Sequence, residues 1–501
     1  MEEISLYILT WNVSVNDPPD EETLKCSLGL DSFELPDLFI IGLQEVSSNP
    51  VDMVANTIHE DPWTQAYMDL LMKYGFVKVR TKKLVGISLN VFSLRKHVPK
   101  LRHIKEDHFK TGVGGYWGNK GAVGIKMEIG GYSFVFLNAH QAAHEGTYYF
   151  EKRLSEYKSI TERLDYLLDK SAKSVTFWFG DLNYRFIVEH TNEKALSEAG
   201  RDSAVSNGVD SVALSQKDRF KMVVNHIAKR NFAGLLQIDE LHKAYASGKA
   251  YEGFIEKQPN FAPTFKYAKN CDVYDEKRIP AWTDRILYKT QGIPYCDPEA
   301  MSNKTSQCIC QTEYDSITSI ALGDHRPVFS RFNVRLKDTS NCELSVAFDE
   351  IEDWTLGISN TVTCSMITNG SDHNLRILGN DWIGIFKEDV FSCLNNYVTY
   401  AYVNDSIVEE RIVERGKKRI DLKFLDSLIC SPGRYIMIYF RSSIVLHDNF
   451  RIERVKDVLG VSDPFVVRNS RDQLWRKPQK LVHCSILLFK PKKMINYISY
   501  R

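Results

Sequence analysis

Residues 176–186, "TFWFGDLNYRF", decide the fold. The first four are aromatic or β-branched, which favours a strand buried on both faces, and Gly180 then allows the backbone to turn. Asp181 and Asn183 follow at the mouth of this strand. A carboxylate or amide so close to an apolar core is costly unless it is paired, hydrogen-bonded or bound to a metal. The stretch therefore predicts a polar site at the end of a core strand.

The same arrangement recurs along the first two thirds of the chain. From residue 4 to about 336, short apolar strands alternate with helical patterns, and one helix is expected over residues 148–169. Several strands end in Asn, Asp, Glu or His, in the stretches "TWN", "LQEV", "NAH", "GDLN", "WTDR" and "GDHRP". This order predicts a layered α/β sandwich whose polar strand ends gather at one edge.

The last third has a different pattern. Residues 337–343, "KDTSNCE", are polar and are expected to form a linker. After them the helical signal nearly vanishes, and stretches such as "DWIGIFK", "YVTYAYV" and "RYIMIYF" predict an all-β sandwich. Residues 468–501 carry nine Lys or Arg against a single acidic residue. Docking on an anionic membrane and a loosely packed extension both fit this tail.

Composition limits the classes of function. A chain of 501 residues is expected to form two domains, and 64 basic residues balance 64 acidic ones, so no overall positive field favours nucleic acid. The ten cysteines are scattered, which indicates free thiols in a reducing compartment. Neither a signal peptide nor a membrane-spanning run is recognisable. We therefore expect a cytoplasmic protein.

Each polar strand end has an ordinary explanation when it is taken alone. Glu45 fits a surface residue closing a strand, His140 a satisfied core histidine, and Asp324 with His325 a turn before a proline. Together they supply carboxylate and amide oxygens, which suit Mg²⁺, whereas the spacing of the histidines does not suit zinc. A metal, polar donors and an aspartate beside a water are what hydrolysis of a phosphate ester requires.

Seven motifs lie in one order over residues 10–329: "TWNV", "GLQEV", "GYWGNKGAVG", "NAHQAAHE", "FGDLNYR", "PAWTDRIL" and "GDHRPVF". They resemble the inositol polyphosphate 5-phosphatases of the deoxyribonuclease I-like superfamily. "DWIGIFK" and "YVTYAYV" resemble the SKICH domain, an immunoglobulin-like β-sandwich, placed as in the skeletal-muscle and kidney-enriched inositol phosphatase subfamily. The resemblance implies a four-layer α/β/β/α sandwich over residues 1–336, a linker over 337–343, a SKICH-like β-sandwich over 344–467 and a basic tail over 468–501.

The resemblance also implies a magnesium site and a water-activating group. Glu45 would be the main carboxylate ligand of Mg²⁺, and Asn12 and Asp324 would complete the metal environment directly or through water. Asp181 would orient and deprotonate the attacking water. Asn183 would hold that water or a phosphate oxygen.

Further roles carried over from the family concern the phosphate that is removed. His325 would donate to the 5-phosphate, and Asp284 would orient and charge its ring. His140 would bind the same phosphate from the other side, with Asn138 nearby. Whether Asp181 or His325 acts as the general base stays open.

Basic residues would set the selectivity. The stretches "FAPTFKYAKN" and "EKRIPAWTDR" resemble the family segments that bind a neighbouring 4-phosphate, which implicates Lys266, Arg278 and Arg285. Solvated surface charges are the alternative for these residues. Lys120 in "GNKGA" is expected in a phosphate-facing turn, with a purely structural glycine loop as the alternative. Phe265 stands where many relatives have tyrosine, so one hydroxyl contact is expected to be absent.

The segment "TGVGGYWGNKG" lies at the membrane-facing rim in this family. Val113 and Trp117 are the apolar side chains expected to insert among acyl chains, and burial of the tryptophan in the core is the alternative. Two departures from the family pattern affect positioning and remove no catalytic group. Gln141 replaces the common leucine, and Gly323 replaces the common serine.

The resulting prediction is a Mg²⁺-dependent phosphoinositide 5-phosphatase. Its substrates would be phosphatidylinositol 4,5-bisphosphate and 3,4,5-trisphosphate, with soluble inositol polyphosphates as further candidates. We expect a monomer with peripheral contact to the plasma membrane or the endoplasmic reticulum, no nucleic-acid partner, and an unidentified membrane or protein partner for the SKICH domain. The alternatives are a catalytically weak phosphoinositide-binding adaptor and a nuclease or phosphodiesterase of the same fold.

Overall fold

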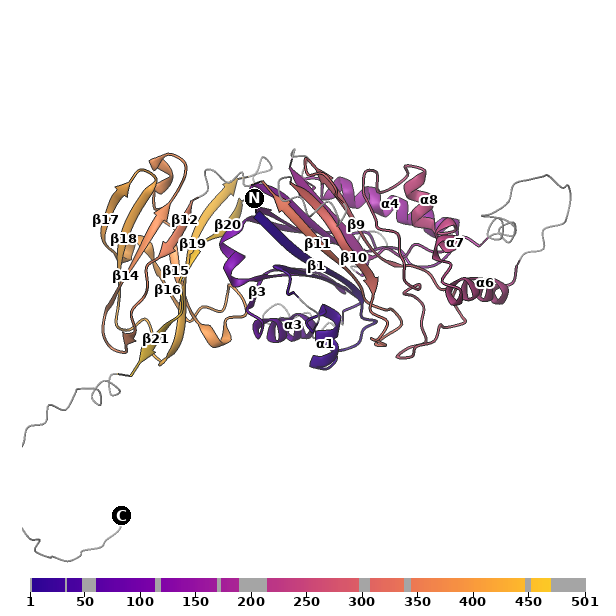
Figure 1. The fold of residues 1–501 in the computed structure, drawn as a ribbon, viewed down its shortest axis with the longest axis horizontal. Helices are drawn as coiled ribbons and strands as arrows, with labels where there is room; N and C mark the ends of the chain where they lie inside the picture. Colours follow the sequence, from indigo (N-terminus) through magenta and orange to yellow (C-terminus); the bar gives the residue numbers. More distant parts are fainter. Residues whose placement is uncertain are drawn as a thin grey trace, which may run out of the picture.

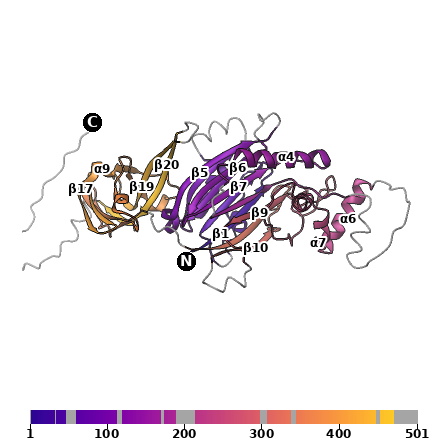
Figure 2. The ribbon, with the colours of Figure 1, turned by 90° about the horizontal axis from the view of Figure 1, so that it is seen from above.

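The computed structural model describes residues 2–31, 34–46, 60–112, 119–168, 173–188, 214–296, 307–337, 344–446 and 452–469. An α/β body and an all-β body lie side by side along the long axis of the molecule (Figure 1), and the view from above agrees (Figure 2). Val113, Trp117, residues 338–343 and residues 470–501 lie outside the described residues. Across the described segments, no helix is long and apolar enough to cross a membrane.

The first sheet of the α/β body is built around a parallel pair of strands. Its order is β10-β11-β1-β2-β4-β3. The strands are β1 (Glu2–Asn12), β2 (Leu38–Gln44), β3 (Phe76–Leu84), β4 (Ile87–Leu94), β10 (Cys308–Ser316) and β11 (Val328–Leu336). β1 and β2 run parallel with Asn12 opposite Gln44, so the stretches "TWN" and "LQEV" end at the same edge.

The second sheet has the order β5-β6-β7-β8-β9. Its strands are β5 (Leu101–Lys110), β6 (Gly121–Ile129), β7 (Tyr132–His140), β8 (Ser174–Asp181) and β9 (Asp284–Gln291). β8 is buried along its whole length, as its aromatic sequence predicts. It runs parallel to β7, with His140 opposite Asp181, and antiparallel to β9, with Asp181 opposite Asp284. The register therefore places these three side chains in one row.

Helices cover the outer faces of the two sheets. α1 (Glu21–Leu28) and α3 (Pro62–Met72) pack on the first sheet, and α4 (Thr147–Arg163) and α8 (Glu240–Ala246) pack on the second (Figure 1). Within the described residues, this body also contains η1 (Arg95–Lys100), α6 (Gln216–Ala228) and α7 (Phe232–Gln237). An aromatic core that includes Phe136, Phe177 and Phe332 fills the space between the sheets. The predicted four-layer α/β/β/α sandwich is confirmed.

The second body is the predicted all-β sandwich. One sheet has the order β12-β14-β18-β17, and the other has the order β13-β21-β19-β15-β16 with β20 paired to β19. The strands are β12 (Ser345–Phe348), β13 (Trp354–Thr355), β14 (Asn360–Ile367), β15 (Trp382–Lys387), β16 (Thr399–Tyr402), β17 (Ile407–Glu414), β18 (Lys417–Phe424), β19 (Gly433–Leu446), β20 (Ile452–Val461) and β21 (Phe465–Arg468). Short helical turns are η4 (Asp372–Leu375), η5 (Glu388–Val390) and α9 (Val403–Ser406).

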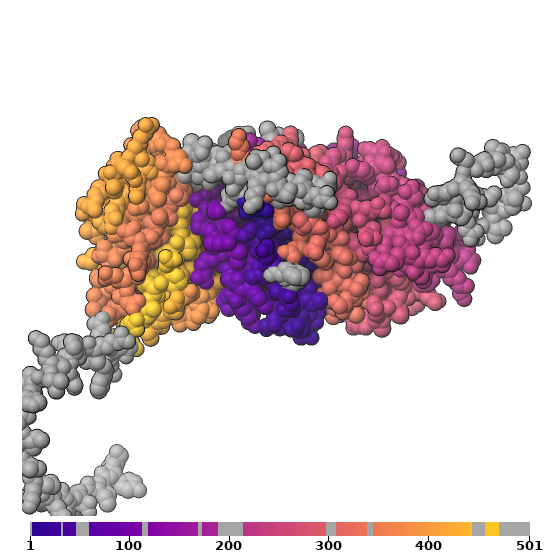
Figure 3. All heavy atoms as spheres, viewed as in Figure 1, coloured from indigo at the N-terminus to yellow at the C-terminus, as the bar shows by residue number. Residues whose placement is uncertain are grey.

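The two bodies share a buried apolar cluster, which we call the interface cluster. Its members are Val77 and Val98 of the α/β body and Trp382, Phe386, Phe391, Ile436, Ile438, Phe440 and Val458 of the β-sandwich. Figure 3 shows the C-terminal strands in yellow directly against the purple surface of the α/β body. Polar contacts surround the cluster: Arg102 donates to the carbonyl oxygens of Leu344, at 3.1 Å, and Val458, and the backbone N–H of His103 donates to Asp457 at 2.9 Å.

Candidate functional site

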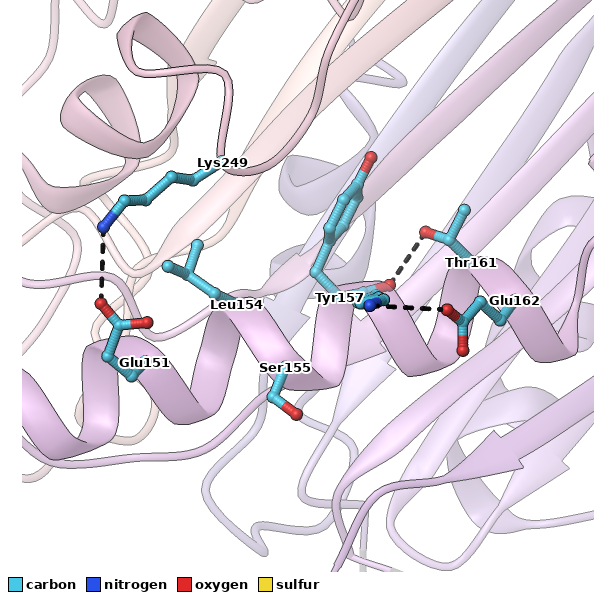
Figure 4. Close-up of a pocket in the computed structure, with 8 residues that line it drawn as sticks. Glu151, Leu154, Ser155, Tyr157, Thr161, Glu162 and Lys249 are labelled. Atoms are coloured by element: carbon cyan, nitrogen blue, oxygen red, sulfur yellow. Dashed lines mark hydrogen bonds and ion pairs between the residues drawn. The ribbon is translucent and has the colours of Figure 1, made fainter.

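A pocket of about 430 Å³ lies where the strand ends meet. Most of the residues predicted from sequence line it, namely Glu45, Lys120, His140, Asp181, Asn183, Lys266, Arg278, Asp324 and His325. They come from segments spread over the whole α/β body. A larger groove of about 620 Å³ runs along α4 (Figure 4), but its charged groups pair with each other, as in Lys249 with Glu151 at 3.5 Å. The smaller pocket is the candidate site, because its charges converge on one space.

Asp181 is the centre of the pocket and is almost completely buried. Its Oδ2 accepts from Nδ2 of Asn12 at 3.0 Å and lies 3.2 Å from Nε2 of His140. Its Oδ1 accepts from the backbone N–H of Asn183 at 3.1 Å. Burial alone would raise the pKa of Asp181, but the adjacent His140, with His325 and Lys120, holds this pKa well below its usual range. Asp181 is therefore an ionised carboxylate with a fixed orientation.

The backbone around Asp181 is tightly constrained. Gly180 has φ +136°, and a Cβ there would lie 1.9 Å from the carbonyl oxygen of Ala139. Only glycine therefore fits next to β7 at this position, directly before Asp181. Asn183 has φ +59°, an uncommon conformation for a residue with a side chain. Its Oδ1 accepts from Nη2 of Arg185 at 2.5 Å, and its Nδ2 donates to the carbonyl oxygen of Gln141 at 3.1 Å. These bonds fix both ends of the amide.

His140 and Lys120 form the wall beside Asp181. Nε2 of His140 contacts Nζ of Lys120 and lies 3.9 Å from Oε1 of Glu45. Burial and then the charge of Lys120 lower the pKa of His140. Burial also lowers the pKa of Lys120. The imidazole of His140 and the amino group of Lys120 thus lie beside the ionised Asp181.

His325 forms the opposite wall. Its Nδ1 lies 2.9 Å from Oδ2 of Asp284, which also accepts from the hydroxyls of Thr264 at 2.7 Å and Thr283 at 2.9 Å. Burial opposes a charge on His325, but the partner carboxylate of Asp284 raises the pKa of His325 to about 9. His325 is therefore protonated at neutral pH, with its ring 4.6 Å from that of Phe265.

Asp324 closes the pocket next to His325. Its Oδ1 accepts from the hydroxyl of Ser14 at 2.5 Å, and its Oδ2 lies 3.3 Å from Nζ of Lys266. The preceding Gly323 has φ +76°, and a Cβ there would lie 2.6 Å from the hydroxyl oxygen of Ser14. The departure from serine at position 323 thus has a local cause, because the Ser14 side chain occupies that space.

Two predicted side chains support the pocket from behind, and two others point elsewhere. Asn12 and Asp284 hold Asp181 and His325 and do not line the pocket. The amide of Asn138 bonds across to the first sheet, with Oδ1 accepting from Gln44 at 2.7 Å. The guanidinium of Arg285 is fully buried between Asp239 and Glu256, at 2.9 and 2.6 Å. We therefore correct the prediction that Arg285 contacts substrate, since its donors are already used inside the protein.

Five pocket residues were not predicted as site residues: Ala143, His144, Glu145, Arg185 and Phe265. Arg185 is the most informative of them. Its guanidinium lies 4.4 Å from the ring of Phe265 and lines the pocket, although only 4% of Arg185 is exposed. Burial lowers the pKa of Arg185 to about 10, so it remains a cation at neutral pH. Its position two residues after Asn183 was the signal that could have placed it in the site.

The oxygen ligands present suit a divalent cation. The carboxylates of Glu45 and Asp324 line the pocket, whereas Oδ1 of Asn12 already accepts from the backbone N–H of Ser14 at 3.0 Å. A second compact group, Asp181, Asp284 and His325, has its ligand atoms within 4.8 Å of one another. The protonated Nδ1 of His325 donates to Asp284, so this group shares a proton. Glu45 and Asp324 thus offer carboxylate oxygens in the pocket, the ligand type that a hard cation takes.

Two family models match the chain. Residues 9–331 match the endonuclease/exonuclease/phosphatase family 2, and residues 346–467 match the SKICH domain. Inositol polyphosphate 5-phosphatase K of Mus musculus is 29% identical over 487 residues, which cover 93% of this chain and 90% of that protein. Phosphatidylinositol 4,5-bisphosphate 5-phosphatase A of Homo sapiens is 30% identical over 472 residues and 92% of this chain. The chain covers only 41% of the length of that human relative.

Solved structures show the same fold. The inositol polyphosphate 5-phosphatase domain of a synaptojanin, in complex with inositol 1,4-bisphosphate and a calcium ion, aligns with a TM-score of 0.51 and 24% identity over 66% of this chain and 84% of that one. A Cimex nitrophorin in a ferrous NO complex aligns with a TM-score of 0.50 and 24% identity over 67% of this chain and 99% of that one. A fold shared with a nitrophorin does not define the chemistry, so the family models and the motifs at the pocket decide the assignment. The chain belongs to the inositol polyphosphate 5-phosphatase family and carries a SKICH domain after its α/β domain.

Proposed function

We propose that the protein is a Mg²⁺-dependent phosphoinositide 5-phosphatase. Its proposed substrates are phosphatidylinositol 4,5-bisphosphate, phosphatidylinositol 3,4,5-trisphosphate and soluble inositol polyphosphates that carry a 5-phosphate. The observation that carries the proposal is one pocket lined by Asp181, His140 and His325, in which Nε2 of His140 lies 3.2 Å from Oδ2 of Asp181 and the pKa of His325 is raised to about 9. The names of the relatives support the substrate class, since one is a phosphatidylinositol 4,5-bisphosphate 5-phosphatase.

The proposed reaction breaks the bond between phosphorus and the inositol 5-oxygen. Asp181 orients a water molecule and accepts its proton as the water oxygen bonds to phosphorus, and Asn183 holds the water or a phosphate oxygen. His325 donates a hydrogen bond to a phosphate oxygen, and His140 contacts the phosphate from the other side. As the bond from phosphorus to the inositol oxygen breaks, the proton that Asp181 took from the water is passed on to that oxygen, and the products are an inositol hydroxyl and inorganic phosphate. The high pKa of His325 favours Asp181 as the base, because a protonated imidazole cannot accept another proton.

Glu45 and Asp324 are proposed to hold the cation, with Asn12 behind them. When bound, Mg²⁺ would neutralise charge on the phosphate oxygens. Lys266 and Arg278 at the pocket rim are proposed to bind the neighbouring 4-phosphate, and Lys120 and Arg185 add positive charge within the pocket. Membrane insertion by Val113 and Trp117, peripheral location at the plasma membrane or endoplasmic reticulum, and a monomeric state remain proposals of the same kind.

Phosphate release from a panel of phosphoinositide vesicles and soluble inositol phosphates tests the proposal. The full chain should release phosphate only from 5-phosphorylated members, and Asp181→Ala should abolish this release. Chelation with EDTA should stop it, and added Mg²⁺ should restore it better than added Ca²⁺. Binding of these lipids by a wild-type protein that releases no phosphate would favour the adaptor, and cleavage of DNA in the same buffer would favour the nuclease.

A further inference from the structure

Gln141 is a buried polar residue next to the candidate pocket. It directly follows His140, its exposed fraction is 0%, and it replaces the leucine expected from the family. A buried amide without partners is costly, so the side chain of Gln141 needs hydrogen bonds that a leucine could not make.

All the polar groups of Gln141 are engaged. Its side-chain Nε2 donates to the carbonyl oxygen of Arg153 in α4 at 2.9 Å, and its Oε1 accepts from the hydroxyl of Tyr251 at 3.0 Å. Its backbone N–H donates to the carbonyl oxygen of Asp181 at 3.0 Å, and its own carbonyl oxygen accepts from Nδ2 of Asn183 at 3.1 Å. Gln141 thus connects α4 to the backbone carbonyl of Asp181 and to the side-chain amide of Asn183.

Tyr251 is a rigid anchor for this connection. It is fully buried, and its ring centroid lies 4.4 Å from that of Tyr157 and 5.5 Å from that of Trp178. Tyr157 also lines the groove along α4, where its ring projects from the helix (Figure 4). Because aromatic neighbours hold the ring, the hydroxyl of Tyr251 has a fixed position from which to hold Oε1 of Gln141.

We propose that Gln141 and Tyr251 form a hydrogen-bonded pair that positions Asn183 and the carbonyl end of Asp181 for the reaction. The inference rests on the proposed 5-phosphatase function and names two positioning residues, neither of which lines the pocket. With Nδ2 of Asn183 fixed on Gln141 and Oδ1 fixed on Arg185, the amide presents one orientation to the pocket. An amide that could rotate would present its oxygen and its nitrogen in turn, and the attacking water would lose its alignment.

A double-mutant cycle on the full-length protein tests the pair, with Gln141→Leu, Tyr251→Phe and their combination. Tyr251→Phe removes the partner of Oε1 of Gln141, and Gln141→Leu removes a partner from the hydroxyl of Tyr251 and from the carbonyl oxygen of Arg153. In each single variant kcat should fall about fivefold to tenfold with KM within about twofold. The double variant removes both polar partners and leaves an apolar pair of similar volume, so kcat should recover to within about threefold of wild type. Tyr245→Phe, at an exposed tyrosine of α8, is the matched control and should change neither constant.

Additive losses in the double variant, a loss confined to KM, or an unchanged kcat in Tyr251→Phe would overturn the proposal. If Gln141→Leu fails to fold, Tyr251→Phe still decides, because it removes a single oxygen atom. Urea unfolding of the same four proteins separates this inference from the proposed function. A wild type that releases no phosphate would refute the function, while a non-additive shift of the unfolding midpoints would still establish the pair, and additive midpoints would refute it.

Discussion

The candidate pocket and the interface with the β-sandwich belong to the same α/β body but bury opposite kinds of side chain. β5 begins at the interface with Arg102 and His103, and the residue after its end, Thr111, donates from its backbone N–H to the carbonyl oxygen of Lys120 at 3.0 Å. The pocket end gathers buried charges, whereas the interface end gathers apolar side chains. In the pocket, each charge sets the pKa of its neighbours, so the residues act as a unit. At the interface, apolar contacts contribute largely through buried area.

Irregular backbone occurs in both regions and serves a different purpose in each. Glu45 and Asn183 adopt positive φ at the pocket, where the turns aim polar groups at one space. His103 adopts φ +49° at a shift of register between β5 and β6, and this bulge directs its N–H to Asp457 of the β-sandwich. The α/β body thus uses positive-φ residues both to orient polar groups at the pocket and to contact the β-sandwich. Activity and unfolding should therefore respond separately to substitutions in the two regions.

The largest expected effect is on activity, at Asp181. Asp181→Asn keeps the shape but removes the charge that orients the water, so phosphate release should fall by at least about 10³-fold. Circular dichroism should show the fold retained. Asp315→Asn, at an exposed aspartate at the end of β10, is the matched control and should keep full activity. A comparable rate from Asp181→Asn would remove Asp181 from the mechanism.

The next effect is on stability, at the interface cluster. Phe440 is almost fully buried and stacks on Trp382 with ring centroids 4.1 Å apart. Phe440→Ala should lower the free energy of unfolding by about 3–5 kcal/mol, the range for truncating a buried phenylalanine, as measured by urea denaturation. Release of phosphate from a soluble substrate, per folded molecule, should stay within about twofold of wild type.

The exposed Leu425 supplies the matched control, since Leu425→Ala should leave the unfolding midpoint nearly unchanged. A loss of activity in Phe440→Ala that exceeds the unfolded fraction would show that the β-sandwich contributes directly to the chemistry. The separation between the two regions would then be wrong.

Sequence reasoning succeeded where strand pattern and motif coincide. The buried run before Asp181 identified β8, and the polar strand ends identified the pocket, because parallel strands such as β7 and β8 bring their ends together. Side-chain direction is not accessible from sequence, so Arg285 was predicted to contact substrate and Arg185 was not predicted as a site residue. Sequence alone does not show which arginine of two neighbouring motifs is paired inside the protein. In the structure, the carboxylates of Asp239 and Glu256 bind Arg285, whereas Arg185 lines the pocket.

The interface was missed although the sequence carried a signal for it. The stretches "WIGIFK" and "YIMIYF" in β15 and β19 are apolar on both faces, whereas a strand of a two-layer sandwich with a solvated outer face alternates. The structure shows that the outward side chains, among them Trp382 and Phe440, pack against the α/β body. The SKICH domain matches residues 346–467. The domain limits predicted from sequence, with the first domain ending at residue 336 and the second beginning at residue 344, stay predictions.

A smaller effect is expected on the pH dependence of activity. His325 has a pKa raised to about 9 by Asp284, so its protonated form, and the stability that this form contributes, is complete below about pH 6.5 and is lost as the pH rises through about 9. The alkaline limb of kcat/KM in wild type should lie near pH 9. Asp284→Asn should move this limb to lower pH and reduce kcat by about 10²-fold. An alkaline limb at the same pH in the variant would mean that another group titrates there.

The smallest expected effect separates binding from chemistry within the pocket. Lys266 is half-buried at the rim, and its Nζ lies 3.3 Å from Oδ2 of Asp324, so it is held in place before a substrate arrives. Lys266→Ala should raise KM about tenfold for a 4,5-bisphosphorylated substrate, the worth of one charge-assisted hydrogen bond, with kcat within about twofold. For a substrate without a 4-phosphate, KM should not change. Lys269→Ala, at an exposed lysine nearby, is the control. An equal loss on both substrates would instead mean that Lys266 acts through Asp324 on the reacting phosphate, and the rim would then belong to the same coupled set of charges as Asp181.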